Sequence, residues 1–295
     1  MKALIYVFSG TGNTLLAANE IKDALTKYDY ECVVYNVRQP FQNVPNPNDY
    51  DVVGFGYPIH AFNTPKFFLD FVKTLPSVNN KLSFIFKTSG EPFWLNNASS
   101  FKLLRIIEKK GFMPITDKHL LMPYYIMFRY KDALAKQMYL HTQDMAKVIA
   151  KQISDQRTDD FKYGLITVLV HTLFRIQWFG AWLNGPLYHV KKDICTQCGK
   201  CVKECPAANI TMVNGYPKFS NKCTMCMNCV VTCPVDAVRP GVLNWWRVNK
   251  RYPFKALVNN EEIPSEYIQN KKIGYFTLFK RYYKNTQREI DKLDK

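Results

Sequence analysis

The sequence predicts an α/β fold, a doubly wound parallel sheet of five strands, followed by a small α+β domain. Short apolar runs alternate with stretches of helical periodicity in the first half of the chain, which is typical of parallel sheets. Eight of the nine cysteines fall in two short segments of the second half. The 295 residues are enough for one large or two modest domains, and a hydrophobic content of 47% excludes a disordered chain.

Five apolar runs are predicted as strands, at residues 2–8, 31–37, 51–55, 82–88 and 116–122. Four segments with apolar residues at helical spacing are predicted as helices, at residues 15–27, 65–75, 99–110 and 131–153. In doubly wound sheets, ligands bind at the carboxyl ends of the strands. The loops after the first, third and fourth strands are therefore the candidate ligand site.

The stretch SGTGNT, residues 9–14, joins the first strand to the first helix. The first N–H groups of a helix have no partner within the helix, and they lie at the positive end of its dipole. Glycines let such a backbone approach a ligand closely, so the loop is typical of a phosphate site. It lacks the lysine of nucleotide-hydrolase loops and the spacing of a dinucleotide fingerprint. A plain helix cap is the alternative.

The cysteines divide into one isolated residue and two motifs. Cys32 lies in an apolar run and is predicted to be a buried core thiol. The other eight form two copies of C-x2-C-x2-C-x3-C-P with a period of 28 residues: Cys195, Cys198, Cys201 and Cys205, then Cys223, Cys226, Cys229 and Cys233. This spacing is the bacterial signature of [4Fe–4S] clusters, whose iron prefers soft thiolate ligands. Two zinc sites or a disulfide framework are the weaker alternatives.

At these residues the chain resembles a known family. SGTGNT after the first strand is similar to the flavin-phosphate loop of flavodoxins, and the whole chain resembles the flavodoxin–ferredoxin fusion proteins of anaerobic bacteria and archaea. The resemblance implies a flavodoxin-like domain at residues 1–155 and a two-cluster ferredoxin domain at 191–240. It also implies one FMN whose phosphate is held by the first loop, Ser9, Gly10, Thr11, Gly12, Asn13 and Thr14.

The resemblance further assigns the flavin ring and the cluster ligands. The ring would lie against the loops after the third and fourth strands, at Pro58, Ile59, His60, Thr88, Ser89, Gly90 and Glu91. His60 stands where many flavodoxins carry a stacking tryptophan. In two-cluster ferredoxins the fourth cysteine of each motif ligates the other cluster. We therefore expect one cluster on Cys195, Cys198, Cys201 and Cys233, and the other on Cys223, Cys226, Cys229 and Cys205.

Residues 156–190 are predicted to be an apolar helical connector between the two domains. Residues 163–190 reach the length of a membrane-spanning helix, but His171 and Arg175 lie near the middle, where a charge in lipid is costly. We expect the connector to pack between the two domains rather than to cross a membrane. A helix lying on a membrane surface is the alternative. A basic extension, residues 241–295, follows, and no chemistry is assigned to it.

The net charge of +16 indicates what kind of partner the protein would bind. Residues 191–295 carry 19 Lys and Arg against 9 Asp and Glu, a field that suits a redox partner protein with an acidic docking face. Nucleic acid is not expected, although tyrosines among the basic residues keep it as an alternative. The first strand begins at once, so no leader and a cytoplasmic location are expected.

The predicted cofactors indicate the function. We expect an electron-transfer protein that passes low-potential electrons between a redox partner, two [4Fe–4S] clusters and FMN. An FMN-dependent reductase of a small molecule, fed by the clusters, is the alternative. A non-redox protein with structural clusters is a third reading. No acid–base pair in the sequence stands out as catalytic.

Overall fold

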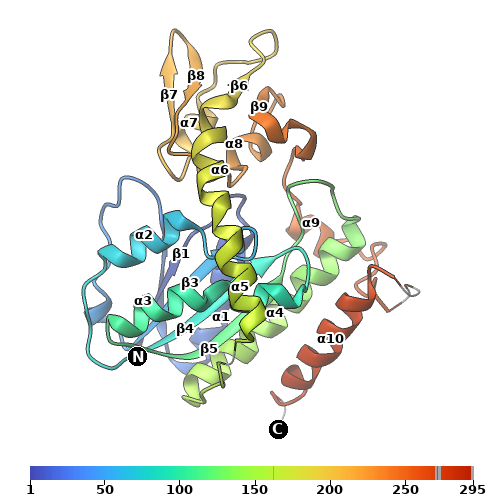
Figure 1. Ribbon diagram of the computed structural model, residues 1–295. Coiled ribbons are helices and arrows are strands. Elements are labelled where there is room, and N and C mark those ends of the chain that lie inside the picture. Colours follow the sequence, from blue (N-terminus) through green and yellow to red (C-terminus); the bar gives the residue numbers. More distant parts are fainter. Residues whose placement is uncertain (162, 270, 272–273, 294–295) are drawn as a thin grey trace.

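The computed structural model describes residues 1–161, 163–269, 271 and 274–293 (Figure 1). Its first part contains a sheet of five parallel strands in the order β2-β1-β3-β4-β5. The strands are β1 (Lys2–Val7), β2 (Glu31–Asn36), β3 (Val52–Pro58), β4 (Lys81–Ser89) and β5 (Phe112–Leu121). This is the strand order of flavodoxin-like doubly wound folds. The predicted fold class of the first domain is therefore confirmed.

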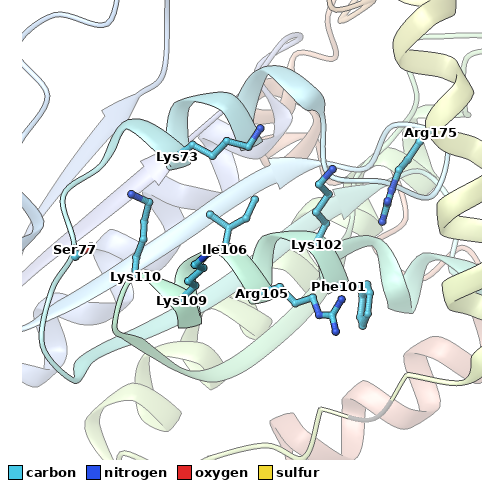
Figure 2. A pocket seen from close by; sticks show the side chains of 9 residues that line it. All are labelled: Lys73, Ser77, Phe101, Lys102, Arg105, Ile106, Lys109, Lys110 and Arg175. Atoms are coloured by element: carbon cyan, nitrogen blue, oxygen red, sulfur yellow. The ribbon is translucent and has the colours of Figure 1, made fainter.

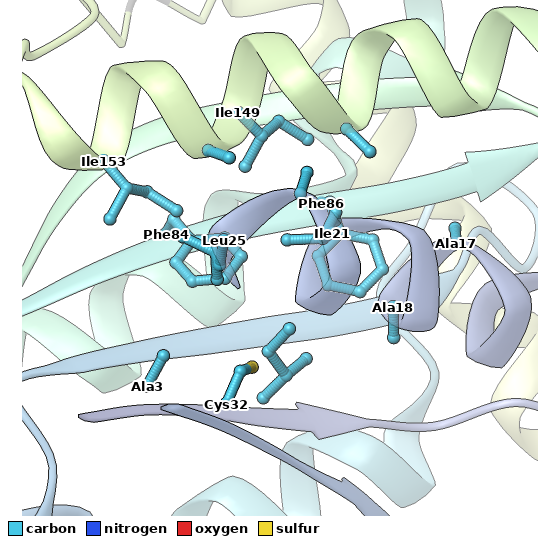
Figure 3. Packing of buried hydrophobic residues seen from close by; sticks show 14 of the residues in the cluster. Ala3, Ala17, Ala18, Ile21, Leu25, Cys32, Phe84, Phe86, Ile149 and Ile153 are labelled. Carbon is cyan, nitrogen blue, oxygen red and sulfur yellow. The ribbon is translucent and has the colours of Figure 1, made fainter. Parts of the chain in front are cut away.

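Helices cover both faces of this sheet. The four helices are α1 (Asn13–Leu25), α2 (Lys66–Thr74), α3 (Phe101–Lys109) and α4 (Asp132–Ser154). Helices α1 and α4 bury Ile21 and Ile149 against Phe84 and Phe86 of β4 (Figure 3), whereas α2 and α3 pack on the opposite face. Cys32 is free and buried in the first of these cores, where burial raises its pKa to about 12. It is the predicted core thiol.

Some element boundaries differ from those predicted. Strand β3 runs on to Pro58, and β5 begins at Phe112 rather than at residue 116. Pro114 lies within β5, which a strand at the edge of a sheet tolerates because one side of its backbone has no ladder partner. Helix α3 follows a 3₁₀ segment (Trp94–Ser100), which takes up the first residues of the predicted helix.

The connector forms a nearly continuous helical segment. It consists of α5 (Leu165–Leu173), a 3₁₀ turn (Phe174–Ile176), α6 (Gln177–Asn184) and a second 3₁₀ turn (Gly185–Leu187). One side packs on the loop after β3, where the side-chain amide of Asn63 donates a hydrogen bond to the carbonyl of His171 (3.0 Å) and the rings of Phe62 and Phe174 meet edge to face. Among the helices of the described residues, none is both long and apolar enough to cross a membrane.

The cysteine motifs lie in a small domain beyond the connector. Strand β6 (Tyr188–Val190) pairs antiparallel with β9 (Val238–Pro240), and β7 (Ile210–Val213) forms a hairpin with β8 (Tyr216–Phe219). Two short helices complete the domain, α7 (Lys200–Lys203) and α8 (Asn228–Val231). Its core is continuous with Leu121, Met122 and the first turns of α4, so the two domains share a buried interface.

The C-terminal extension returns to the first domain. A 3₁₀ segment (Gly241–Trp246) leads to α9 (Phe254–Asn259) and α10 (Thr277–Ile290), and α10 lies beside α4 in Figure 1. The hydroxyl of Tyr282 donates a hydrogen bond to the carbonyl of His119 (2.6 Å), and Lys118 forms an ion pair with Glu289 (2.7 Å). These contacts fix α10 of the extension to β5 of the first domain.

Candidate functional site

The eight motif cysteines are distributed around two separate cavities. The first cavity is lined by three cysteines of the first motif and the last one of the second: Cys195, Cys198, Cys201 and Cys233. The second cavity is lined by the other four: Cys205, Cys223, Cys226 and Cys229. The structure therefore brings together the same two sets of four that the ferredoxin resemblance implies. All eight are free thiols, so they are available as ligands.

The cysteines surround these cavities rather than converge on a point. Among the described residues, no three His, Cys, Asp or Glu side chains come close enough together to hold a single metal ion. Four thiolates spread around a cavity suit the core of a four-iron cluster, in which each sulfur ligates a different iron. The donor set, which is made up of cysteines alone, also fits the preference of iron–sulfur clusters for soft ligands.

The backbone of the two motifs repeats as the sequence does. Left-handed backbone conformations occur at Gln197 and Gly199 in the first motif and, 28 residues later, at Met225 and Met227 in the second. Gly199 and Met227 also occupy the N-cap positions of α7 and α8. The same turn geometry is therefore built with glycine in one copy and with methionine in the other.

Backbone amides in and after the two motifs donate hydrogen bonds to cysteine sulfur atoms. The amide of Met225 donates to Sγ of Cys223 at 3.3 Å. The amide of Asn209 donates to Sγ of Cys205 (3.3 Å), and the amide of Ala237 donates to Sγ of Cys233 (3.2 Å), again 28 residues apart. Hydrogen bonds to sulfur are one of the factors that set the reduction potential of a cluster.

The first cavity is lined by one exposed cysteine, Cys198, and one buried cysteine, Cys201, whereas the four cysteines of the second cavity are all half-buried. Burial, followed by the charge of Cys226, raises the pKa of Cys223 to about 12, and burial raises the pKa of Cys226 to about 11. Cys198 is exposed, and a hydrogen bond from the backbone of Lys200 lowers its pKa. Burial also raises the pKa of Cys201 in the first cavity to about 11, so a metal bound by thiolates in either cavity would displace protons. The first cavity reaches the surface.

The three loops predicted to hold a flavin meet at one edge of the sheet. The hydroxyls of Thr14 and Thr88 are hydrogen-bonded at 2.7 Å, which joins the loop after β1 to the end of β4. The amide of Ile59 donates to the carbonyl of Thr88 (2.8 Å), which joins the loop after β3 to the same strand. The structure thus brings the three sets of predicted residues together, as parallel strands that end at one edge require.

The loop after β1 has the features of an anion site. Gly12 has a φ of 108° and occupies the N-cap of α1, a conformation that glycine adopts without steric cost. The hydroxyl of Ser9 is buried and has no hydrogen-bond partner among the described residues. The side-chain amide of Asn13 donates instead to the carbonyl of Pro123 (2.8 Å). A phosphate oxygen bound at the N-terminus of α1 could accept the hydrogen bond that the Ser9 hydroxyl has available.

Cys226 lies directly on this loop. A Cβ atom placed on Gly10 would stand 2.6 Å from the Cβ of Cys226 and 2.7 Å from its carbonyl oxygen, so only glycine fits here. Arg251 of the C-terminal extension approaches the neighbouring turn, with its guanidinium carbon 3.8 Å from a Cβ placed on Gly12. The same guanidinium donates a hydrogen bond to the side chain of Asn228 (3.0 Å), which lies within the second cysteine motif.

Of the two loops expected at the flavin ring, the one after β4 is covered by aromatic residues. The ring of Tyr124 lies 2.6 Å from a Cβ placed on Gly90, and the hydroxyl of Tyr130 donates to the Gly90 carbonyl (3.0 Å). Tyr275 of the extension donates a hydrogen bond to the carboxylate of Glu91. His60 is half-buried, and burial lowers its pKa to about 4, so the imidazole is neutral near pH 7.

Sequence reasoning did not identify Arg251, Tyr124 or Tyr275 as neighbours of the loops. No motif marks them. Tyr124 lies in the loop after β5, and Arg251 and Tyr275 reach the site through the return of the C-terminal extension. The basic residues around Arg251 in RVNKRYP were the one available signal, and they indicated only a charged surface.

Comparisons with known proteins match two different parts of the chain. Residues 188–241 match the family model of the 4Fe-4S dicluster domain, so this part is an iron–sulfur domain. The first part resembles solved flavodoxin structures. A flavodoxin from the domain Archaea shares 14% identity over 52% of this chain and 99% of its own, with a TM-score of 0.36.

Two further flavodoxins are similar at the same level. The flavodoxin of Streptococcus pneumonia TIGR4 shares 14% identity over 53% of this chain and 99% of its own, with a TM-score of 0.39. The flavodoxin of Megasphaera elsdenii shares 24% identity over 41% of this chain and 85% of its own, with a TM-score of 0.34. No curated protein sequence matches the chain significantly. The chain thus joins a domain of flavodoxin-like strand order to a 4Fe-4S dicluster domain, the arrangement expected of a flavodoxin–ferredoxin fusion protein.

Proposed function

We propose that this protein is an electron carrier in which two [4Fe–4S] clusters and one FMN lie in series. An iron–sulfur domain joined to a flavodoxin-like domain supports an electron-transfer role in general. The observation that carries the specific proposal is the contact between Cys226 and Gly10. A ligand of the second cluster touches the loop proposed to bind the flavin phosphate, so the two cofactors need no diffusional encounter.

The cysteines would hold the clusters in the two sets that line the cavities. Cys195, Cys198, Cys201 and Cys233 form the first site, and Cys223, Cys226, Cys229 and Cys205 form the second. Each fourth cysteine comes from the other motif, so the two sites are interlocked. When bound, the clusters supply one-electron transfer and the flavin exchanges one or two electrons.

The loop Ser9–Thr14 would hold the phosphate of FMN. Support comes from the orphaned Ser9 hydroxyl, from Gly12 at the start of α1, and from the nearby positive charge of Arg251. These groups provide a hydroxyl donor, free backbone amides and a cation at one place. The loop carries no second phosphate motif, so we propose FMN rather than a dinucleotide.

Electrons would enter at the first cluster site. Cys198 is exposed there, and the side chains of Lys191, Lys192 and Lys200 are exposed close to it in the sequence. This basic surface suits a redox partner protein with an acidic docking face, which long-range charge attraction would steer to the exposed end. The path would then lead through the second cluster, with its half-buried cysteines, to the loop that contains Gly10.

The contacts around the ring loops favour a carrier over a reductase of a small molecule. Tyr124 covers Gly90, Tyr275 bonds to Glu91, and Cys226 covers Gly10. The loop after β5, the C-terminal extension and the second cysteine motif thus occupy space beside the predicted flavin site that a second substrate would need.

Anaerobic purification followed by analysis of iron, sulfide and flavin tests the proposal. We expect roughly eight irons for each FMN, as two four-iron clusters require. In stopped-flow experiments with reduced clusters, the flavin should then be reduced at a rate that does not depend on protein concentration. A preparation with full iron but no flavin, or a rate that rises with concentration, would contradict the series arrangement.

A further inference from the structure

The connector exposes an apolar face along its whole length. Six large side chains recur at spacings of three and four residues and are between 57% and 75% exposed: Leu165, Leu169, Leu173, Ile176, Phe179 and Leu183. This spacing places them along one side of the helical segment, over roughly 28 Å. We call this set the apolar ridge. A contiguous exposed apolar surface of this kind is typical of a site of interaction with a partner or a membrane.

The opposite side of the same segment is fixed to the protein. Thr167 and His171 are buried there, and Nδ1 of His171 lies 3.2 Å from the carbonyl of Phe62. Gln177 donates a hydrogen bond to the carbonyl of His60. The connector therefore cannot roll its apolar side inward without breaking these contacts. The exposure of the ridge follows from the way in which the helix is anchored.

A basic groove lies beside the ridge. It has a volume of about 540 Å³ and is lined by six cationic side chains from α2, α3 and the connector: Lys73, Lys102, Arg105, Lys109, Lys110 and Arg175 (Figure 2). Phe101, Ile106 and Ser77 complete its lining, and no carboxylate of the described residues takes part. Arg175 connects the two features, since it lines the groove while its neighbours Phe174 and Ile176 are exposed on the connector.

The charges in this groove are poorly compensated within the described chain. Lys73 forms an ion pair with Asp70 (2.9 Å), but no ion pair is recorded there for Lys102, Arg105, Lys109 or Arg175. Nε of Arg175 is buried and has no hydrogen-bond partner among the described residues. Burial, followed by the charge of Arg175, lowers the pKa of Lys102. An anion in the groove would satisfy the Arg175 nitrogen and offset this repulsion.

We propose that the apolar ridge and the basic groove together form a docking surface for an anionic lipid bilayer. Amphipathic helices that lie in the membrane interface combine an apolar face, which enters the headgroup region, with flanking Lys and Arg residues, which bind anionic lipids. The ridge supplies the first element and the groove supplies the second. The proposal is independent of the cofactors that the chain binds.

The charge of the groove favours a membrane over a second copy of this chain. A symmetric dimer would pair ridge with ridge and would bring the two grooves toward each other, each with four cations that form no ion pair within the described part of the chain. An anionic bilayer complements the apolar surface and the charge at once. Binding should therefore need both anionic lipid and the ridge, and it should weaken as salt is added.

Co-sedimentation of the purified full-length protein with vesicles tests the proposal. We expect binding to vesicles that contain phosphatidylglycerol and at most weak binding to phosphatidylcholine alone. Leu173→Ser with Ile176→Ser removes two apolar side chains and should weaken binding about tenfold or more. Arg105→Glu with Lys109→Glu should also weaken it at least about tenfold, since each basic residue near an anionic surface contributes roughly fivefold.

Control variants carry similar substitutions outside the ridge and the groove, and they show whether the position of the substituted residues matters. Val213→Ser removes an exposed apolar side chain from the β7–β8 hairpin, and Arg281→Glu with Lys284→Glu makes the same change in net charge on α10. Both controls should bind like the wild type, and equal iron content in all variants shows that they are folded. Loss of binding in the controls, or no binding of the wild type to anionic vesicles, would overturn the proposal. A wild-type dimer that the ridge variant converts to a monomer, without vesicle binding, would assign the surface to a second copy.

Discussion

Gly10 and Cys226 are in direct contact, so that a Cβ atom on Gly10 would lie 2.6 Å from the Cβ of Cys226. The first residue lies in the loop after β1, and the second lies in the downstream cysteine motif. The contact joins a predicted phosphate site to a predicted cluster ligand across the domain interface. It makes the distance between the two cofactor sites depend on a single glycine.

Gly10→Ala should therefore disturb both stability and electron transfer. The added methyl group must displace backbone or the Cβ of Cys226, and overpacking of this kind typically costs about 1–3 kcal/mol. We expect a lower melting temperature and slower reduction of the flavin by the clusters. Gly180→Ala is the matched control, because a Cβ placed on Gly180 meets no atom within 4 Å. Equal flavin reduction rates in the two variants would show that the contact is unimportant for the electron path.

Cys205→Ala should damage the cluster of the downstream motif rather than that of its own motif. Cys205 lines the same cavity as Cys223, Cys226 and Cys229, whereas Cys195 lines the other. Electron paramagnetic resonance of the reduced single-cysteine variants is the measurement, and we expect the spectral loss in Cys205→Ala to match that in Cys223→Ala. If it matches Cys195→Ala instead, each motif holds its own cluster and the crossed assignment is wrong.

Thr11→Asp should release the flavin and leave the iron in place. The half-buried Thr11 lies within the predicted phosphate loop, so a carboxylate there would repel the phosphate group at short range. The flavin-to-iron ratio after gel filtration measures the effect. Thr158→Asp makes the same change at an exposed position far along the chain and should keep its flavin. Full flavin content in Thr11→Asp would place the flavin elsewhere.

Arg251→Gln should weaken FMN binding about tenfold or more, in keeping with the loss of one hydrogen bond to a charged group. The guanidinium stands beside Gly12 and is held there by Asn228, so it is already in position before the ligand binds. Titration of deflavinated protein with FMN gives the dissociation constant. Arg157→Gln, at an exposed position of the first domain, serves as the control. An unchanged constant in Arg251→Gln would remove Arg251 from the phosphate site.

His141→Gln should make thermal stability less dependent on pH in the acid range. His141 is buried between α4 and α10, with its Nε2 2.8 Å from the hydroxyl of Thr286. It faces Tyr282 and Tyr283 of α10, as well as Asp144 of its own helix. Burial lowers its pKa from 6.5 to about 4, although Asp144 acts in the opposite direction.

The sign of the effect follows from where the proton binds. In the unfolded chain His141 is protonated below about pH 6.5, whereas in the folded protein it is protonated only below about pH 4. The free energy of unfolding therefore falls as the pH is lowered through this range. The loss reaches at most about 3 kcal/mol. The melting temperature at pH 7 and pH 5, measured at one scan rate, should therefore differ less in His141→Gln than in the wild type. His189→Gln, at an exposed histidine, should retain the wild-type difference, and an unchanged difference in both variants would contradict the prediction.

Much of the fold was predictable because its signals are local. The apolar period of each strand and helix, the glycine turn at Gly10 and Gly12, and the cysteine spacing all depend on residues that are near one another in the sequence. The five strands and four helices of the first domain are therefore confirmed, with shifts of a few residues at their ends.

Only the tertiary structure decided which distant segments meet. The sequence showed that the connector is apolar, but it did not show that His171 would face the protein while Leu173 would face outward. It contained Arg251 and Cys226, but nothing in either local pattern placed them against the loop after β1. The spacing of residues along a strand or helix is set by fixed backbone geometry. Contacts between separate elements depend instead on how whole surfaces pack, and that information is spread over the entire chain.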